Sequence, residues 1–383
     1  MAIITSHPIQ YNAPLFQLLA KRGRVEIKVF YTWGKKSIEE KFDPGFGKNI
    51  KWDIPLLDGY NYQFLENTSK NPGSHNFSGI KNPSIIEEIK SFSPNAILLF
   101  GWSFHSHLKV LRHFKGKVKI LFRGDSTLLD QPAAVSIKKI LRKTFLTWVY
   151  KHIDVALYVG ECNRNYFLNY GLKENQLVFA PHFVDNNRFK NSIDSNLVLA
   201  FKSQFSIKQD DFVYVFVGKL EHKKRPLLLL NAFADLNLQN AHLIFVGNGE
   251  QESELRQHAN QFSSIHFLPF QNQTIIPSVY ATANYLVLPS GGPNETWGLV
   301  VNEAMACGIP AIVSTKVGCA ADLIDNGKNG FVFKADDEFE LKNALKTAYD
   351  SKHCYASFSK NASDTISFYT IENTAKVIEE KTL

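Results

Sequence analysis

The chain has 383 residues, of which 44% are hydrophobic and 21% are charged. This composition excludes a disordered protein, and the length favours two domains over one. A formal charge of +7 favours anionic partners, but there is no Lys/Arg tract interleaved with aromatic residues, no zinc-finger spacing and no RNA-binding pattern. We therefore expect no nucleic-acid partner.

The cysteines indicate a reducing environment. Cys162, Cys307, Cys319 and Cys354 are far apart, form no C-x-x-C pair and have no histidine spaced to complete a metal site. The N-terminus enters an apolar strand-like run without a charged leader region, and no stretch approaches the roughly 20 apolar residues of a membrane span. These features favour a cytoplasmic protein.

Short apolar runs alternate with amphipathic stretches along the whole chain, which predicts parallel sheets covered by helices. The strands expected in the first half are Ala2–Thr5, Glu26–Tyr31, Ala96–Phe100, Val118–Phe122, Val155–Val159 and Leu177–Ala180. Those expected in the second half are Phe212–Val217, His242–Val246, Ile265–Leu268, Tyr285–Leu288 and Ala311–Val313.

The segment Pro181–Ser206 is rich in Asn, Asp and Ser without a clear period, and we interpret it as the linker between two similar α/β units. The predicted fold is α/β, with one Rossmann-like domain at residues 1–190 and a second at residues 191–365. The helix expected over Ile366–Leu383 crosses back to the first domain.

One segment of the first half, Ser136–His152, combines cationic and large apolar side chains. Its cations are Lys138, Lys139, Arg142 and Lys143, set among Ile, Leu, Phe, Trp and Val. Such a helix lies on an anionic membrane face in some proteins and packs its apolar side on a sheet in others. Peripheral contact with the inner face of the membrane and an ordinary surface helix both stay open.

The loop after the strand Phe212–Val217 is strongly basic. Gly218 permits a sharp turn, four cations follow, and Pro226 begins a helix over Pro226–Leu236. Cations beside a helix N-terminus suit a diphosphate, and a solvated basic turn is the alternative. The next loop, Gly247-Asn248-Gly249, lacks the third glycine of a dinucleotide fingerprint, which disfavours an NAD-dependent enzyme.

The pattern at residues 289–310 is the most informative of the chain. It reads P-S-G-G-P-N-E-T-W-G-L-V-V-N-E-A-M-A-C-G-I-P, and a helix is expected over Gly298–Cys307 because Gly308 and Pro310 end it. An ionised Glu303 among apolar neighbours needs hydrogen-bonding partners.

The free amides at the start of this helix, those of Gly298, Leu299 and Val300, suit a phosphate. Glu303 and Glu295 are then left to accept hydrogen bonds from sugar hydroxyls. A core Glu303 satisfied by backbone groups and a helix-capping Glu295 are the alternatives.

Together these residues resemble the retaining glycosyltransferases of family 4, which have the GT-B fold of two Rossmann-like domains facing each other across a cleft. Glu295 and Glu303 match the family's E-x7-E motif, with Trp297 where Phe is commoner. The segment Gly218-Lys219-Leu220 with Lys224 resembles the family's G-R-L-x-x-x-K-G, Lys219 replacing Arg. Gly247-Asn248-Gly249 and Asn329-Gly330-Phe331-Val332 resemble further family segments, so that the matches cover most of residues 212–335.

The resemblance implies that Lys219 and Lys224 stabilise the departing diphosphate, that Glu295 binds the donor sugar and that Glu303 binds the ribose. The other residues expected on the donor side are Gly218, Asn248, Trp297, Gly298, Leu299 and Val300. Lys219 keeps the charge of the usual Arg but gives up its bidentate fork.

In the first half, ligand contacts are expected in the loops beyond the carboxyl ends of the strands. The acceptor-side candidates are His7, Gln10, Tyr11, Trp102, His105, Arg123 and Asp125. Asp125 is the first-domain candidate for contact with the reacting sugar or acceptor, and a cap on the following helix is its alternative role. His105 is equally an ordinary loop residue.

The expected reaction transfers a hexosyl-type sugar from a UDP or GDP sugar to a saccharide or lipid-linked saccharide, as in surface polysaccharide biosynthesis, with Asp125, Lys219, Lys224 and Glu295 as the catalytic set. The family implies retention of configuration, and with no D-x-D triplet we expect no metal and no cofactor. A non-catalytic nucleotide-sugar-binding protein and a nucleotide-sugar epimerase are the alternative functions.

Overall fold

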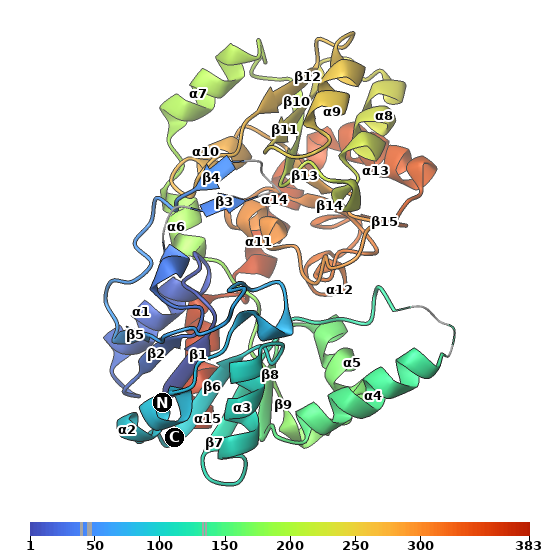
Figure 1. Ribbon diagram of the computed structural model, residues 1–383. Helices are drawn as coiled ribbons and strands as arrows, with labels where there is room; N and C mark the ends of the chain where they lie inside the picture. The colour runs from blue at the N-terminus through green and yellow to red at the C-terminus, as the bar shows by residue number, and fades with distance from the viewer. Residues whose placement is uncertain (39–40, 44–47, 132–133, 135) are drawn as a thin grey trace. The chain divides into compact units, whose positions relative to one another are not determined.

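The computed structural model describes residues 1–38, 41–43, 48–131, 134 and 136–383. These residues separate into two compact units (Figure 1). Unit 1 contains the described residues of 1–38, 55–182 and 371–383, and unit 2 contains those of 41–54 and 183–370. The change from unit 1 to unit 2 at residues 182–183 comes earlier than the predicted boundary at 190, and unit 2 includes a segment from the first predicted domain.

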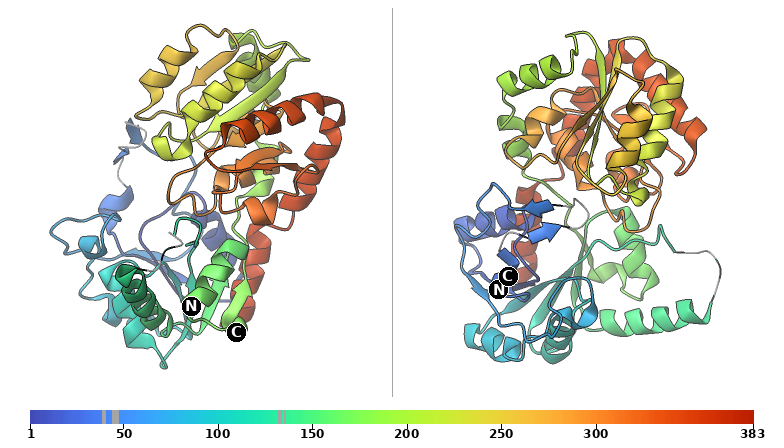
Figure 2. Two further views of the ribbon diagram at one scale, coloured as in Figure 1. Left: turned by 90° about the vertical axis from the view of Figure 1, so that its right-hand side faces the viewer. Right: turned by 45° about the horizontal axis from the view of Figure 1, so that its top comes forward.

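Unit 1 is built on a seven-stranded parallel sheet with the strand order β5-β2-β1-β6-β7-β8-β9. Its strands are nearly continuous apolar runs, such as Ala-Ile-Leu-Leu-Phe in β6, because helices cover both faces (Figure 2). Its elements are β1 (Ala2–Thr5), α1 (Asn12–Arg22), β2 (Lys28–Tyr31), β5 (Tyr62–Phe64), α2 (Ile85–Phe92), β6 (Ala96–Phe100), α3 (His105–Phe114), β7 (Lys119–Arg123), α4 (Ile137–Tyr150), β8 (Val155–Tyr158), α5 (Glu161–Asn169), β9 (Leu177–Phe179) and α15 (Ile371–Thr382).

Unit 2 contains a six-stranded parallel sheet with the order β12-β11-β10-β13-β14-β15, and a separate antiparallel pair, β3 with β4. All six residues of β10 are buried, again because helices cover both faces. Its elements are β3 (Lys41–Asp43), β4 (Lys48–Ile50), α6 (Asn186–Asn191), α7 (Ser195–Gln204), β10 (Phe212–Val217), α8 (Pro226–Leu236), β11 (Ala241–Val246), α9 (Glu252–Ala259), β12 (Ile265–Leu268), α10 (Ile276–Tyr280), β13 (Tyr285–Leu288), α11 (Leu299–Ala306), β14 (Ala311–Ser314), α12 (Ala320–Leu323), β15 (Gly330–Phe333), α13 (Glu338–Asp350) and α14 (Tyr355–Ile366).

Each large sheet reverses its strand order once. In unit 1 the chain runs outward from β1 and returns to β6 beside it, and in unit 2 it runs outward from β10 and returns to β13 beside it. The loops after two such neighbouring strands leave in opposite directions, and the crevice between them is the usual ligand site of an open parallel sheet. The two predicted parallel-sheet α/β domains are confirmed.

The sequence predictions differ from the structure in three places. The expected linker, Pro181–Ser206, holds two helices, α6 and α7, which begin at the capping residues Asp185 and Asp194. Their short lengths hid the helical period. Strands β5 and β15 were missed because each has few residues, and the helix expected over Ile366–Leu383 begins only at Ile371, since Ile366 is the last residue of α14.

Helix α15 packs on α1 within unit 1, and a buried carboxylate joins them. Glu379 lies 2.9 Å from Arg22 Nε and 3.3 Å from Arg24 Nη1. Because an unpaired buried carboxylate is costly, these cations allow Glu379 to lie in the core. Among the described residues, no helix is both long and apolar enough to cross a membrane.

Candidate functional site

The candidate site of unit 2 lies where its strand order reverses. The basic loop Gly218–Arg225 follows β10, and the loop Pro289–Gly298 follows the neighbouring strand β13. The two loops touch through their backbones, because the amides of Gly291 and Gly292 each donate to the Lys223 carbonyl at 3.0 Å. The polar residues of both loops are therefore held close together.

An ion pair connects these loops. Lys224 Nζ donates to Glu295 Oε2, and Ser290 Oγ donates to the same oxygen at 2.8 Å. The side chains of Lys224 and Glu295 are 15% and 10% exposed, so the pair is only weakly screened by water. The structure thus brings together two of the residues predicted from sequence, and it adds Ser290, which the sequence pattern did not single out.

A second ion pair fixes the end of the basic loop. Arg225 adopts a left-handed backbone conformation with φ 54° just before α8, and its Nε lies 2.6 Å from Asp336 Oδ1. A Cβ added to Gly291 would come within 2.4 Å of that Asp336 oxygen, so a larger residue there would displace the Asp336 side chain from this contact. Sequence reasoning missed Asp336 because it lies far along the chain, in the loop after β15.

The glycines of the two earlier loops allow close backbone packing. A Cβ on Gly247 would come within 1.9 Å of the Gly218 carbonyl oxygen, and a Cβ on Gly249 within 2.3 Å of the Leu220 carbonyl oxygen. Lys219 lies half-buried between Gly218 and Leu220 in this packed turn. The G-x-G pattern therefore has a structural reason, which is the contact between the loops after β10 and β11.

Asn248, predicted to contact the donor, uses its side chain to hold this turn. Its Oδ1 accepts from the Phe270 amide at 3.0 Å, and its Nδ2 donates to Glu252 at 2.9 Å. Its own carbonyl accepts from the Leu220 amide at 3.0 Å. These contacts make Asn248 a support for the basic loop.

Helix α11 begins behind this site at Gly298, whose φ of 96° is left-handed. A Cβ there would meet Val317 and Leu288 side chains at 2.9 and 3.0 Å, so the tight start of the helix requires glycine. Leu299 and Val300, in the first turn, are half-exposed. The start of α11 agrees closely with the helix expected over Gly298–Cys307.

Two predicted donor-side residues lie in the interior of unit 2. Glu303 is 3% exposed, and its Oε2 accepts from the Tyr280 hydroxyl at 2.7 Å. Trp297 is also 3% exposed, and its indole nitrogen donates to Asn302 Oδ1 at 2.7 Å. Glu303 is thus a buried carboxylate, as in the alternative considered from sequence, but a side-chain hydroxyl and not the backbone donates to it here, and its ribose role stays a prediction.

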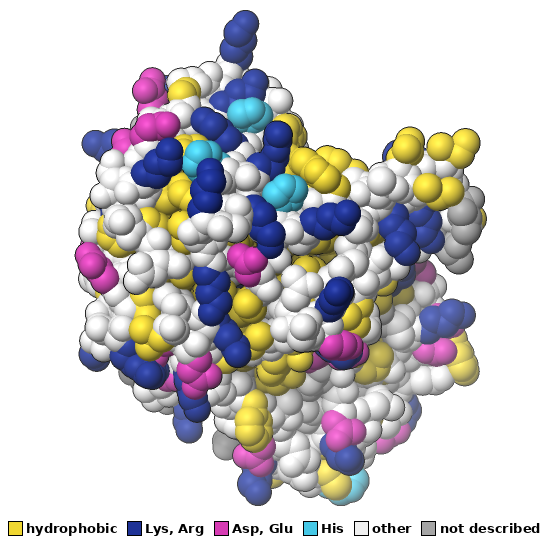
Figure 3. Space-filling view, turned by 90° about the horizontal axis from the view of Figure 1, so that it is seen from below, with side chains coloured by type: hydrophobic (Ala, Val, Ile, Leu, Met, Phe, Trp, Pro, Cys, Tyr) yellow, Lys and Arg dark blue, Asp and Glu magenta, His cyan; other side chains and the backbone are white. Residues whose placement is uncertain are grey.

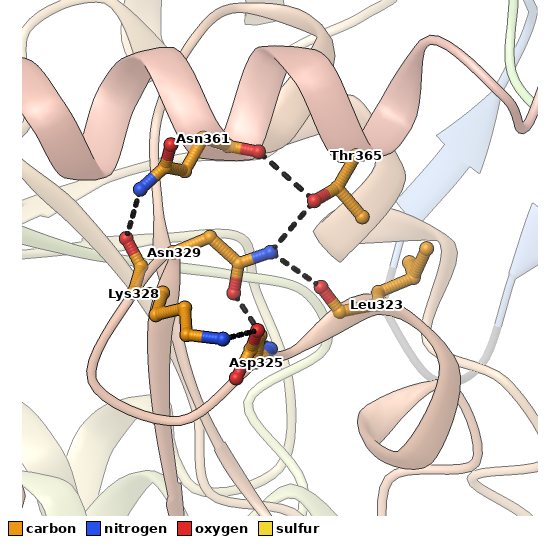
Figure 4. Close-up of polar contacts among 6 residues, drawn as sticks. All are labelled: Leu323, Asp325, Lys328, Asn329, Asn361 and Thr365. Carbon is orange, nitrogen blue, oxygen red and sulfur yellow. Dashed lines mark hydrogen bonds and ion pairs between the residues drawn. The ribbon is translucent and has the colours of Figure 1, made fainter.

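The family-like segment that begins at Asn329 is held by side-chain amides (Figure 4). Asn329 Nδ2 donates to the Leu323 carbonyl and to Thr365 Oγ1, both at 2.9 Å, and Asn329 Oδ1 accepts from the Asp325 amide at 2.8 Å. Asn361, on α14, donates to the Lys328 carbonyl at 3.0 Å. Asn329 thus fastens the turn before β15 to α14.

In unit 1 the acceptor-side candidates lie at or beyond the carboxyl ends of β1, β6 and β7, where Arg123 is the last residue of β7, His105 is the first residue of α3 and the others are in loops. His7 Nδ1 lies 2.9 Å from Ser6 Oγ, and its ring meets Trp33 edge-on at 5.1 Å. Tyr11 is half-exposed, whereas Gln10 is 9% exposed. Trp102, after β6, packs edge-on against Phe145 at 5.5 Å.

Arg123, predicted on the acceptor side, is held by backbone carbonyls, and its acceptor contact stays a prediction. Its guanidinium is buried and donates to the Ala180 and Pro181 carbonyls, both at 2.8 Å, so it ties β7 to the end of β9. Burial lowers the pKa of Arg123 to about 10, and the negative charge of Asp125 opposes that shift.

Asp125 is half-exposed beside Arg123 and does not cap the following helix. That helix, α4, is capped by Ser136, whose Oγ accepts from the Lys139 amide at 3.2 Å. Among the described residues, no group of three or more His, Cys, Asp or Glu side chains is arranged to hold a metal ion.

Comparison with known proteins finds a family likeness within unit 2. Residues 199–365 match the model of the glycosyl transferases group 1. The chain is 28% identical over 177 residues to D-inositol 3-phosphate glycosyltransferase 2 of Catenulispora acidiphila, covering 43% of this chain and 41% of that protein. It is 28% identical over 196 residues to the alpha-monoglucosyldiacylglycerol synthase of Acholeplasma laidlawii, covering 50% and 48%. The chain thus spans less than half the length of these relatives.

Solved structures show a likeness over the whole chain. The Anabaena HepE structure in complex with UDP and glucose has a TM-score of 0.72 at 18% identity, covering 99% of this chain and 98% of that one. The sucrose-phosphate synthase of Thermosynechococcus elongatus has a TM-score of 0.73 at 18% identity, covering 99% and 97%. The fold is therefore that of the GT-B glycosyltransferases.

We predict that Gly247→Ala destabilises unit 2 by more than about 2 kcal/mol. The added Cβ would clash with the Gly218 carbonyl oxygen, which belongs to the backbone and cannot move away as a side chain can. Gly327→Ala is the matched control. Its φ of 79° is also left-handed, but nothing lies within 4 Å of the added Cβ, so only about 1 kcal/mol is expected. Urea unfolding of both variants measures the difference. Equal losses would show that the loops after β10 and β11 are not in tight contact.

Proposed function

We propose that the protein transfers a sugar from a nucleotide-diphosphate donor to a saccharide or lipid-linked saccharide, because residues 199–365 match the model of the glycosyl transferases group 1. The observation that carries the proposal is the contact of Lys224 with Glu295 at the reversal point of the second sheet. It joins a cation suited to a diphosphate with an acid suited to sugar hydroxyls.

The donor's diphosphate lies by the basic loop in this proposal. Lys219 and Lys224 stabilise the negative charge that grows on the leaving diphosphate, and the first amides of α11 contribute the positive end of the helix. The ammonium of Lys224 is already held by Glu295, so it needs little rearrangement when the donor binds. Such preorganisation is what electrostatic stabilisation of a leaving group requires.

Glu295 has a second role in the proposal. When the diphosphate binds the Lys224 ammonium, Oε2 of Glu295 becomes available to accept hydrogen bonds from hydroxyls of the donor sugar. Ser290 continues to hold the carboxylate in place. Transfer then proceeds with retention, by attack on the same face of the sugar. The donor phosphate accepts the proton of the acceptor hydroxyl as the bond to the leaving diphosphate breaks.

The proposal predicts that nucleotide diphosphates and their sugars stabilise the protein against heat. A matching UDP or GDP ligand at 100 times its dissociation constant adds about 2.7 kcal/mol to the free energy of unfolding. A thermal-shift screen over a panel of nucleotide diphosphates and their sugars, followed by a transfer assay, measures this. Consumption of the sugar nucleotide without any acceptor, giving an isomer, would point to an epimerase instead.

Lys224→Met tests the key contact in the same assay. Losing one charge-assisted hydrogen bond raises the dissociation constant of the nucleotide diphosphate about 10- to 100-fold. Lys346→Met is the matched control, since Lys346 also pairs with a carboxylate of unit 2, Asp350, but on the surface. Glu295→Gln keeps nucleotide-diphosphate binding and loses transfer. Unchanged binding by the Lys224 variant would contradict the proposed site.

We also propose that the reaction needs no metal ion. Cationic side chains and helix amides neutralise the charge of the diphosphate, as a metal ion does in other enzymes. Transfer activity is then unchanged in excess chelator. The assay compares rates after exhaustive chelation with rates after adding Mg²⁺ or Mn²⁺. A strict dependence on either ion would overturn this part of the proposal.

Helix α4 supports the further proposal that the protein meets an anionic membrane. Ile137, Leu141 and Phe145, spaced four residues apart, form an apolar stripe and are 78%, 65% and 43% exposed, whereas the buried residues of the helix, Leu146, Val149 and Tyr150, lie toward its C-terminal end. Between Ile137 and Tyr150 there are four cations and no acid. Figure 3 shows hydrophobic side chains projecting beside Lys and Arg on this face. Such a helix suits the boundary of an anionic bilayer.

Flotation with vesicles tests the membrane contact. The protein is expected to float with vesicles that contain anionic lipid and to stay behind with neutral ones. Leu141→Glu removes the association because it places a charge in the inserted stripe, whereas Leu199→Glu, on the 66% exposed Leu199 of unit 2, leaves it intact. Equal flotation of both variants would contradict a role for α4.

A further inference from the structure

Unit 1 has a long hollow beside α3 that the sugar-transfer proposal does not use. One half has a volume of 540 Å³ and the adjoining half 670 Å³, and both are lined by Phe77 and Leu108. Each volume is within the range of about 300–1,000 Å³ that is usual for small-molecule sites. We call this pair of hollows the α3 trench.

The first half of the trench is apolar and aromatic. Trp102 and Phe104 line it together with Phe145 of α4. Trp102 meets Phe145 edge-on at 5.5 Å, so the two rings form a continuous wall, and Phe77 on the opposite side is 42% exposed. Apolar surface of this kind gains free energy when a hydrocarbon chain covers it.

The second half is cationic. His105, Lys109, Arg112 and His113 line it at spacings of three and four residues, which places them on one face of α3. The Arg112 guanidinium lies over the Trp148 ring, 5.7 Å from its centroid, and so connects the charged half with the aromatic wall of α4. Of the described residues that line the two halves, none is an Asp or Glu.

Two further observations indicate an anionic ligand. Burial first, and then the positive charges of Lys81 and Lys109, lower the pKa of His105, so two lysines act on this half of the trench. The Nε2 atom of His113 is buried and has no hydrogen-bond partner within the described part of the chain. A ligand oxygen in this half would reach that atom only after the His113 ring turned toward it.

We propose that the α3 trench binds a phosphate-headed lipid, with the phosphate on the cationic half and the hydrocarbon chain along the aromatic half. The charge and the apolar lining complement the two ends of such a molecule, and neither end alone would fill both halves. This binding does not depend on sugar transfer. It gives Trp102 and His105 a lipid-binding role in place of the acceptor contacts expected from sequence.

Calorimetric titration of the whole chain with dodecyl phosphate, below its micellar concentration, tests the proposal. We expect saturable binding that is at least about tenfold tighter than that of dodecyl maltoside, which has the same chain without the charge, or of inorganic phosphate, which has the charge without the chain. Equal affinity for either comparison compound would overturn the proposal.

Variants locate the binding. Ser103 lines the apolar half and is exposed, so Ser103→Trp fills the trench at little cost to folding, and binding is lost. The double variant Lys109→Glu with Arg112→Glu weakens dodecyl phosphate binding at least about tenfold and leaves dodecyl maltoside unaffected. Lys119→Glu, at an exposed position outside the trench, is the charge control and binds as the wild type does.

The outcomes separate this proposal from the others. If Ser103→Trp and the double variant both bind dodecyl phosphate as tightly as the wild type does, the amphiphile binds elsewhere and the proposed site in the trench is wrong. The titration contains no sugar donor. If the protein binds dodecyl phosphate but no nucleotide diphosphate, the trench proposal is supported and the sugar-transfer proposal is contradicted. Leu141→Glu, which tests the membrane contact of α4, is expected to leave dodecyl phosphate binding unchanged.

Discussion

The backbone contact between the loops after β10 and β13 determines where the polar groups of unit 2 lie. Two glycine amides donate to the Lys223 carbonyl, and this contact holds the ammonium of the next residue, Lys224, against Glu295. Without it, both side chains would be free in mobile loops, and ordering them would consume conformational entropy when a ligand binds. The glycines therefore help to preorganise the charges of the site, because they allow Lys224 and Glu295 to be in contact before a ligand binds.

Because this contact between loops must be supported, the residues of the family-like motifs have different roles. Lys224 and Glu295 face each other at the carboxyl end of the sheet, whereas Asn248, Asn302 and Asn329 bond to backbone or neighbouring side chains that shape the loops. A motif read from sequence does not separate these roles. Both kinds of residue are needed, since a charge acts on a ligand only from a position that its supports fix.

Much of this could be predicted from the sequence, since buried parallel strands are apolar runs and helix ends carry Pro and Gly. The helix Pro226–Leu236 and the strand Phe212–Val217 were predicted with their observed bounds. What could not be predicted depends on contacts between residues far apart in the chain. Arg123 was predicted to contact a ligand because it follows an apolar strand run. The sequence did not indicate that its guanidinium donates to the Ala180 and Pro181 carbonyls. The pairing of Arg225 with Asp336 gave no local signal either.

Helix α4 shows how position changes the meaning of a pattern. Its amphipathic sequence fits a helix that packs its apolar side on a sheet, and Leu146 and Val149 do so. The apolar stripe in the N-terminal part of the helix, which includes Ile137 and Leu141, is left in water, where exposed hydrocarbon has a free-energy cost unless something covers it. The cations that flank the stripe determine what can cover it, since they favour an anionic surface and oppose a basic one. The exposed stripe and the cationic α3 trench meet at Phe145, so one face of unit 1 carries apolar and positive groups side by side, as binding to anionic lipid requires.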